Sequence, residues 1–381
     1  MRGAAQPAEQ RLAARDNFTG ASAREDLRLS FKAAAEAARE QPAHSFRLAG
    51  AHVTFRFAGQ HLAERLTRAF AHLEVPSEAT PDLTLFVWES AAGGAPRPLL
   101  APPDPGQPKP LPDTTSGRFP LGHTHVHPSY HFADGPLEAL FQPTFDFLSA
   151  LSLEDGCAWF WMDDSARQPS WDLAGPFRHL LSWWLSARGL QKVHAGAVGT
   201  DAGGVLVVGK GGSGKSTTCL SVLGHDGLRY AGDDFVAVSI GPEPVVHSLY
   251  CSGKVDPDNV SRLPHLEPAI SNADRLDSEK AIVFVNDLFP GAVVAGFPLQ
   301  AILIPRIVDR VHSAIVPTPS AAAVTALAPS TMLQLHPPPP QALGRIRRLA
   351  AVVPAFVLEL GSDVAGVPDT LRQFLDELRS R

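Results

Sequence analysis

The sequence has few cysteines and lysines and no long apolar run. Three cysteines occur among 381 residues, at Cys157, Cys219 and Cys251. Their odd number and spacing form neither a disulfide framework nor a zinc pattern, which favours a reducing compartment. Apolar runs such as 205–208 are far shorter than the ~20 residues that cross a bilayer. The sequence therefore predicts neither a disulfide-stapled secreted protein nor a membrane-spanning one.

Other absences narrow the class of protein further. The first residues lack the apolar segment of a secretory signal, so we expect a cytoplasmic protein. The net charge is −6 and no basic face is evident, so nucleic acid is not an expected partner. The strings Leu-Ser-Gly-Gly-Gln and Asn-Lys-x-Asp do not occur, which argues against an ABC ATPase and a GTPase.

Lysine is scarce, and arginine carries most of the positive charge. The seven lysines are Lys32, Lys109, Lys192, Lys210, Lys215, Lys254 and Lys280. A chain that places Arg on its surface makes a Lys in the second half a better candidate for contact with phosphate. We expect Lys254 and Lys280 to lie near such a group, although plain surface lysines are the alternative.

The composition divides the chain into three parts. Residues 1–44 are rich in Ala, Arg and Glu and predict a flexible or helical arm. Residues 45–185 predict an α+β accessory domain that contains a proline-rich loop at 95–113. Residues 186–381 carry the candidate chemistry.

Hydrophobic periodicity places several elements in the accessory part. Alternation predicts strands over 53–57, 83–88 and 157–162, and a helix is expected over 61–73. A further helix is expected from Ser170 or Asp172 to about Arg188, where Gly189 would end it. Its apolar residues recur at helical spacing and are interpreted as core.

A phosphate-binding motif occurs in the last part. Residues 209–216 match G-x-x-x-x-G-K-[ST] at every fixed position, after a predicted strand at 205–208 and before a predicted helix. Such a loop turns backbone N–H groups toward phosphates, while Lys215 reaches the β- and γ-phosphates and Ser216 binds Mg²⁺. The predicted nucleotide site comprises Gly209, Gly211, Gly212, Ser213, Gly214, Lys215, Ser216 and Thr217. We expect ATP and Mg²⁺ as ligands; a glycine-rich turn without nucleotide is the alternative.

Two adjacent carboxylates follow one helix later. Asp233 and Asp234 lie in a strand-like segment after Gly232. Neighbouring strand residues point to opposite faces, so the two can serve one site only if the backbone bends, and Gly232 could supply that bend. One carboxylate would bind Mg²⁺ and the other would accept a proton from a hydroxyl group. An exposed Asp turn is the alternative.

His194 is the third candidate residue. It precedes the predicted phosphate-loop strand within Val193-His194-Ala195-Gly196. A histidine beside small apolar residues is also common as a structural residue, and His194 alone does not decide between these roles.

Together these features resemble the HPr kinase/phosphorylase family over about residues 190–310. The shared series is His194, the loop at 209–216, and Gly232-Asp233-Asp234. The resemblance implies an α/β P-loop kinase domain of the HPr kinase/phosphoenolpyruvate-carboxykinase type, preceded here by the smaller α+β domain. It also implies that Asp233 is the proton acceptor, with His194 as its neighbour and Lys215 on the phosphates. Asp234 and Ser216 would be on the magnesium side.

The sequence departs from that family after the Asp pair. The expected segment with glutamate and arginine is replaced by His247-Ser248-Leu249-Tyr250-Cys251-Ser252-Gly253-Lys254. The chain is more similar to the divergent kinases found with lasso-peptide biosynthesis, which implies transfer to a Ser or Thr hydroxyl of a peptide or protein. A small-molecule kinase and an ATPase or nucleotide-sensing module are the alternatives. The acceptor, reverse phosphorolysis and the oligomeric state, a homo-oligomer included, stay open.

Overall fold

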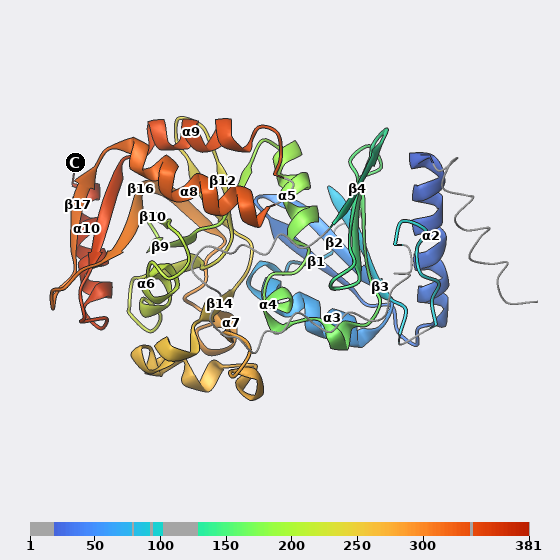
Figure 1. Cartoon of the computed structure of the whole chain (residues 1–381), viewed down its shortest axis with the longest axis horizontal. Helices are drawn as coiled ribbons and strands as arrows, with labels where there is room; N and C mark the ends of the chain where they lie inside the picture. The colour runs from blue at the N-terminus through green and yellow to red at the C-terminus, as the bar shows by residue number, and fades with distance from the viewer. Residues whose placement is uncertain (1–18, 78–79, 92–93, 102–128, 336–337, 381) are drawn as a thin grey trace, which may run out of the picture.

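The protein is a mixed α/β molecule with two large sheets and one small one (Figure 1). Its computed structural model describes residues 19–77, 80–91, 94–101, 129–335 and 338–380. Most of the proline-rich loop expected at 95–113, from residue 102 onward, lies outside the described residues. No helix within the described ranges is long and apolar enough to cross a membrane.

The first sheet has seven strands in the order β1-β2-β3-β7-β6-β5-β4. β3 pairs in parallel with both β2 and β7, and all other neighbouring strands of this sheet pair antiparallel. Three strands cover those expected from alternation, because apolar residues at every second position bury one face. The strands are β1 (Ala43–Leu48), β2 (Ala51–Phe57), β3 (Leu83–Glu89), β4 (Tyr130–Asp134), β5 (Leu137–Gln142), β6 (Phe147–Ser152) and β7 (Cys157–Met162).

Helices cover both faces of this sheet. α2 (Gly20–Ala37) buries Ala23 and Leu27 against it, so this part of the expected arm is a packed helix (Figure 1). On the other face lie α3 (Gln60–Thr67), the 3-10 helix η2 (Arg68–Leu73) and α5 (Arg178–Ala187). The 3-10 helix η3 (Ser165–Arg167) and the short α4 (Ser170–Leu173) precede α5.

The single helix expected from residue 170 or 172 to about 188 is wrong. The structure divides it into α4 and α5. The break falls at Gly175-Pro176-Phe177, where Pro176 has no N–H for a helical hydrogen bond and Phe177 has a φ of 62°. The apolar stripe of α5 is nevertheless core, as expected, since Leu180, Leu181 and Trp184 are buried.

The second sheet has nine strands and carries the phosphate-loop motif. Its main path runs β11-β9-β10-β16-β13-β12-β8, and β18 pairs with both β16 and β17. β10, β16 and β18 are parallel to one another, so their carboxyl ends meet at one edge. The strands are β8 (Gln191–Val193), β9 (Gly196–Thr200), β10 (Gly203–Val207), β11 (Arg229–Gly232), β12 (Val236–Ser239), β13 (Val245–Ser248), β16 (Gly296–Ile307), β17 (Ala314–Thr318) and β18 (Ala355–Leu360).

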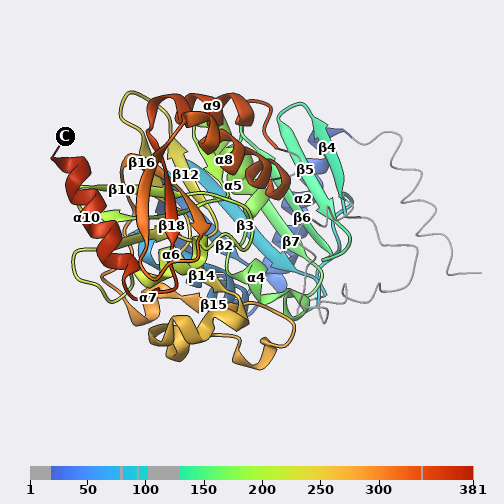
Figure 2. The same cartoon turned by 60° about the vertical axis from the view of Figure 1, so that its left-hand side comes forward.

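Two pairs of helices enclose this sheet (Figures 1 and 2). α6 (Lys215–Ser221) and α10 (Val367–Arg379) pack on one face, and α8 (Ser320–Gln334) and α9 (Ala342–Val352) pack on the other. A smaller layer beside α6 contains the paired strands β14 (Ser252–Val255) and β15 (Ala281–Phe284). It is completed by η4 (Pro257–Arg262), η5 (Pro264–Ala269), η6 (Ala273–Arg275) and α7 (Val285–Leu288).

One hydrophobic core joins the two halves of the chain. The buried cluster around Phe46, Phe55 and Phe70 also contains Phe235 and Tyr250 from the second half. The rings of Phe70 and Tyr250 lie 5.3 Å apart. Arg68 of η2 also pairs with Asp287 of α7 at 2.5 Å and stacks 4.2 Å from the Phe284 ring centroid. The two sheets therefore share packed side chains as well as a connecting chain.

Candidate functional site

The glycine-rich loop joins the carboxyl end of β10 directly to α6. Val208 continues the strand by donating its N–H to the Leu303 carbonyl at 2.9 Å, and the loop begins at Gly209. This strand–loop–helix order is the one expected from the motif. Lys215 is buried, whereas Gly211 and Gly212 are exposed and Ser213, Gly214, Ser216 and Thr217 are half-buried. The middle of the loop is thus exposed to solvent, whereas Lys215, at the start of α6, is buried.

Gly214 shows why the loop needs glycine at this position. Its φ is +100°, a conformation that residues with a Cβ rarely adopt. A Cβ at this position would also overlap Leu360 at the end of β18 and lie 3.9 Å from Pro305. A residue with a Cβ would therefore strain the loop backbone and displace the Leu360 side chain.

The ammonium group of Lys215 points into the loop. Its Nζ donates to the carbonyl oxygens of Gly209 at 2.8 Å and Lys210 at 3.1 Å. Burial lowers the pKa of Lys215, while the carboxylates of Asp233 and Asp234 act in the opposite direction. The loop and the Asp pair are thus within electrostatic range of each other.

A bend at Gly232 brings the two carboxylates to the same edge. β11 ends at Gly232, which has a φ of +156°, and the pairing with β9 is irregular between Tyr230 and Gly232. A Cβ on Gly232 would lie 2.8 Å from Val236 Cγ1. The expected bend is present, and Asp233 and Asp234 leave the strand at the edge where β10 enters the loop.

Asp233 is the more deeply buried member of the pair, with 2% exposure. Its Oδ2 accepts a 3.0 Å hydrogen bond from the backbone N–H of Lys254. Burial raises the pKa of Asp233 and the charge of Asp234 adds to the rise; the Lys254 amide, the Ser216 hydroxyl and Lys215 oppose it. Asp233 therefore lies beside the two motif residues that the sequence assigns to phosphate and magnesium.

Asp234 is held by two other side chains. Its Oδ1 lies 2.9 Å from His194 Nε2, and its Oδ2 accepts a 2.6 Å hydrogen bond from Lys254 Nζ. Burial alone would raise the pKa of Asp234, but Lys254 and His194 outweigh it and hold that pKa well below its ordinary value. The structure thus brings His194 against Asp234, whereas the sequence-based expectation made it the neighbour of Asp233.

Two further charged residues, Lys192 and Asp172, lie within electrostatic range of Lys254, and Arg178 lies within range of both of them. Lys192 is 1% exposed, donates to the Arg178 carbonyl at 3.1 Å, and has its Nζ 4.3 Å from the Phe235 ring centroid. Arg178 in turn pairs with Asp172 at 3.2 Å. Burial lowers the pKa of Lys192 well below its ordinary value. Residues of α4 and α5 therefore contribute to the surroundings of the Asp pair.

Several buried polar atoms at the site accept or donate no hydrogen bond of normal geometry within the described part of the chain. They are His194 Nδ1, Ser213 Oγ and Asp233 Oδ1. Buried polar atoms are rarely left unsatisfied, so these atoms are available to a ligand or water. Across the described residues, no three His, Cys, Asp or Glu side chains converge as a protein-only metal site. A site of one hydroxyl and one carboxylate completed by phosphate oxygens suits Mg²⁺.

Sequence reasoning missed two contacts of this site. The hydroxyl of Thr331 in α8 accepts a 3.1 Å hydrogen bond from the His194 backbone N–H, and no sequence signal marks it. Lys254 was singled out only by the scarcity of lysine, and it binds Asp234 directly. Lys280 is exposed, yet its charge helps to lower the pKa of Lys215, so it lies within electrostatic range of the loop.

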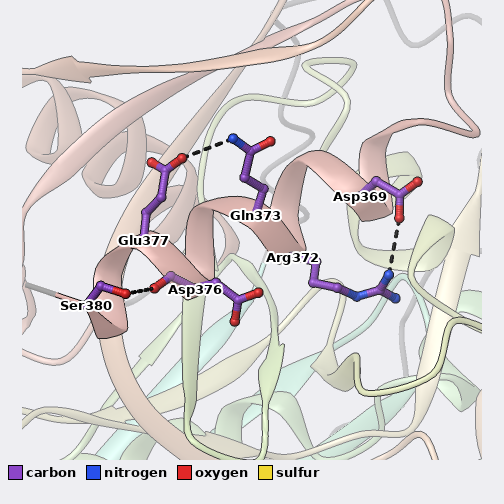
Figure 3. A pocket seen from close by; sticks show the side chains of 6 residues that line it. All are labelled: Asp369, Arg372, Gln373, Asp376, Glu377 and Ser380. Carbon is purple, nitrogen blue, oxygen red and sulfur yellow. Dashed lines mark hydrogen bonds and ion pairs between the residues drawn. The ribbon is translucent and has the colours of Figure 1, made fainter.

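A separate surface hollow of about 700 Å³ lies on α10 (Figure 3). Its lining residues are polar and all come from the outward face of that helix: Asp369, Arg372, Gln373, Asp376, Glu377 and Ser380. They contact one another, as in the pairs Arg372–Asp369 and Gln373–Glu377. None belongs to the loop or the Asp pair, so the hollow is distinct from the candidate site.

Comparison with known proteins gives limited similarity. No family model matches the sequence, and no curated protein matches it. Among solved structures, the chain is similar to the structure of the Hpr(Ser) kinase/phosphatase from Coxiella burnetii, with 13% identity and a TM-score of 0.28. The match covers 50% of this chain and 99% of that one. A likeness of this size does not extend to function, which is inferred below from the chain's own residues.

Proposed function

We propose that the chain is an ATP-dependent kinase that transfers the γ-phosphate to a Ser or Thr hydroxyl of a peptide or protein. One observation carries the proposal. The loop at 209–216 and the Asp233–Asp234 pair meet at one sheet edge, with His194 and Lys254 hydrogen-bonded to Asp234. This combination supplies a phosphate cradle, a metal-side carboxylate and a carboxylate that can face an acceptor.

The loop fits a triphosphate. Lys215 Nζ now donates to two loop carbonyls, and it needs only a side-chain rotation to donate to phosphate oxygens instead. Ser213 Oγ is buried without a partner in the described chain and faces the same loop. A lysine that satisfies carbonyls in the free loop is ready to exchange them for a more negative ligand.

The residues beside Ser216 fit Mg²⁺. The Ser216 hydroxyl and the Asp233 carboxylate would hold the ion, whose charge stabilises the phosphoryl group during transfer. This division differs from the one implied by the family resemblance, which assigned Asp234 to magnesium. It follows from burial: Asp233 is enclosed next to Ser216, and its raised pKa signals a carboxylate that a cation would stabilise.

Asp234 suits the acceptor side. Its side chain is 28% exposed, so a hydroxyl group can approach it, and His194 and Lys254 fix its orientation. Lys254 and His194 hold its pKa well below the ordinary value, so it stays ionised and can accept a hydrogen bond from the acceptor hydroxyl group. His194 Nδ1 has no partner among the described residues and is free to bind the acceptor or a water molecule.

An alcohol acceptor matches this chemistry best. A hydroxyl group benefits from a carboxylate that takes its proton, whereas a carboxylate or phosphate acceptor would instead need several extra cations. Within the described site, Lys254 is already committed to Asp234. The resemblance to lasso-associated kinases makes the serine of a precursor peptide the first acceptor to test.

The test combines ATP–Mg²⁺ with candidate peptides that carry a Ser, and with matched peptides in which that Ser is Ala. Mass spectrometry locates any added phosphate. Phosphate on the Ser peptide alone, lost with Lys215→Ala, supports the proposal. Label only on a sugar or another metabolite would identify a small-molecule kinase. Hydrolysis of ATP with no acceptor labelled would instead identify an ATPase.

A further inference from the structure

The ribbon formed by β14 and β15 borders both carboxylates of the candidate site. Lys254 in β14 donates its backbone N–H to Asp233 at 3.0 Å and its ammonium group to Asp234 at 2.6 Å. Lys254 lies opposite Ile282 of β15, and Lys280 is two residues before Ile282. A diagonal offset of two residues across a ribbon corresponds to about 7–8 Å. Lys280 therefore lies near the residue that contacts both carboxylates.

A buried amide fixes the backbone at this point. Asn272 is 5% exposed, and its side chain makes two hydrogen bonds to the start of β15. Its Oδ1 accepts from the Ile282 N–H at 2.8 Å, and its Nδ2 donates to the Lys280 carbonyl at 2.9 Å. The Lys280 side chain itself is exposed. The chain thus presents this side chain from a fixed backbone, without further ordering on binding.

The ammonium group of Lys280 makes no hydrogen bond or ion pair within the described ranges of the chain. The neighbouring carboxylate of Glu279 is directed elsewhere. It accepts a 3.2 Å hydrogen bond from the Ser170 backbone N–H and lies 3.7 Å from Arg275. Lys254, by contrast, is paired with Asp234. The three N–H donors of Lys280 are therefore available to a ligand.

Lys280 also acts on the buried lysine of the glycine-rich loop. Burial lowers the pKa of Lys215, and the charge of Lys280 adds to this effect. Two ammonium groups within electrostatic range repel each other, and both attract an anion that enters the space between them. The attraction is strengthened by burial, since Lys215 is 7% exposed. Two like charges in this arrangement suit an anion-binding site.

The γ-phosphate is the part of ATP that would meet both lysines. A loop of this kind brings its lysine to the β- and γ-phosphates. The phosphate that is transferred must face the Asp pair, and the ribbon of β14 and β15 contacts that pair through Lys254. Of the three phosphates, the γ-phosphate is therefore the one turned toward the ribbon and Lys280.

We infer that Lys280 binds the γ-phosphate of ATP, which would lie between the ammonium groups of Lys280 and Lys215. The site would then prefer a nucleoside triphosphate to a diphosphate. The inference rests on the proposed phosphate site at 209–216. A compact ammonium group on a flexible stem suits contact with a phosphate that is bound and released in every cycle.

The experiment measures by calorimetry the binding of two probes that differ in the γ-phosphate, ADP–Mg²⁺ and β,γ-methylene-ATP–Mg²⁺. Lys280→Met removes the charge and keeps an apolar stem. It is expected to weaken the triphosphate analogue about tenfold, or ~1.4 kcal/mol, and to leave ADP within about twofold. Arg275→Met, at a half-exposed arginine of η6 in the same layer, is the control and should bind both probes like the wild type. Thermal unfolding confirms that each variant is folded.

The outcomes separate this inference from the proposal beneath it. If Lys280→Met binds both probes like the wild type while Lys215→Ala loses both, the γ-phosphate contact is overturned and the phosphate site stands. If Lys280→Met weakens ADP as much as the analogue, the residue acts on the loop and the contact is again overturned. The same holds if Arg275→Met weakens the analogue as much as Lys280→Met does. If the wild type binds neither probe, the phosphate site falls and this inference falls with it.

Discussion

His194 Nε2 lies 2.9 Å from Asp234 Oδ1, although the two residues are forty positions apart in the chain. The contact forms because β8 and β11 both reach the edge where the glycine-rich loop begins. It assigns the histidine to Asp234, the more exposed carboxylate of the pair, which the proposed function places on the acceptor side.

The first prediction concerns Lys215. Lys215→Ala removes the one buried ammonium within the loop, and ATP turnover should fall about 10²–10³-fold because its charge is lost from the transferring phosphate. Steady-state kinetics and calorimetry with ATP–Mg²⁺ measure the change. Lys32→Ala, at an exposed lysine of α2, is the control and should behave like the wild type. Turnover near the wild-type level in Lys215→Ala would exclude the loop as the nucleotide site.

The second prediction separates the two carboxylates. Asp234→Asn should lower phosphotransfer at least about 100-fold while nucleotide affinity is nearly unchanged, since the ionised carboxylate proposed to orient the acceptor hydroxyl is lost. Asp233→Asn should instead raise the Mg²⁺ concentration needed for half-maximal activity. Titration of Mg²⁺ at fixed ATP distinguishes the two. The opposite pattern would support the division implied by the family resemblance, with Asp233 as the acceptor-side residue.

The third prediction concerns the bend at Gly232. Gly232→Ala should destabilise the protein by ~1–3 kcal/mol and impair catalysis, because a Cβ meets Val236 and disfavours the positive φ. Gly241→Ala is the matched control, since a Cβ there has open space. Urea unfolding and turnover are measured for both. Equal stability and activity in the two variants would show that the bend does not depend on glycine.

The fourth prediction is a pH dependence of stability. Burial lowers the pKa of His72 to about 3, and its Nε2 lies 2.7 Å from the Ser248 hydroxyl across the two halves. Between pH ~6.5 and 3 the unfolded chain binds a proton that the folded chain does not, so stability falls as the pH falls through this range. His72→Gln should lose less stability between pH 7 and 5 than the wild type in thermal unfolding.

The control for His72→Gln is His225→Gln, at an exposed histidine. Its loss of stability on acidification should match that of the wild type. If the stabilities of His72→Gln and the wild type fall equally as the pH falls, His72 does not make the stability of the protein depend on pH.

The sequence was most informative where the chemistry depends on local spacing. The motif at 209–216 needs only neighbouring residues, so the loop, its strand and its helix could be predicted, as could the bend at Gly232. Alternation predicted β2, β3 and β7 for the same reason. The partner of His194 could not be predicted, because it depends on which of two adjacent carboxylates the bend turns outward.

Other features depend on contacts between distant segments. Thr331 reaches His194 from α8, and Arg178 reaches Lys192 from α5, and neither pair leaves a pattern in the sequence. The break in the helix at Phe177 was also seen only in the structure, although the sequence Gly175-Pro176 disfavours a continuous helix at this point.

The packing of Phe70 on Tyr250 has a consequence for how the molecule opens. Because one cluster of rings spans both sheets, amide hydrogens of β2 and β12 should exchange with solvent in a single cooperative event. Cutting the chain near residue 186 would then leave each fragment with half of an exposed aromatic cluster, prone to associate with its counterpart. When the two fragments are expressed together, we expect them to associate into one folded complex, as the fragments of a split protein do.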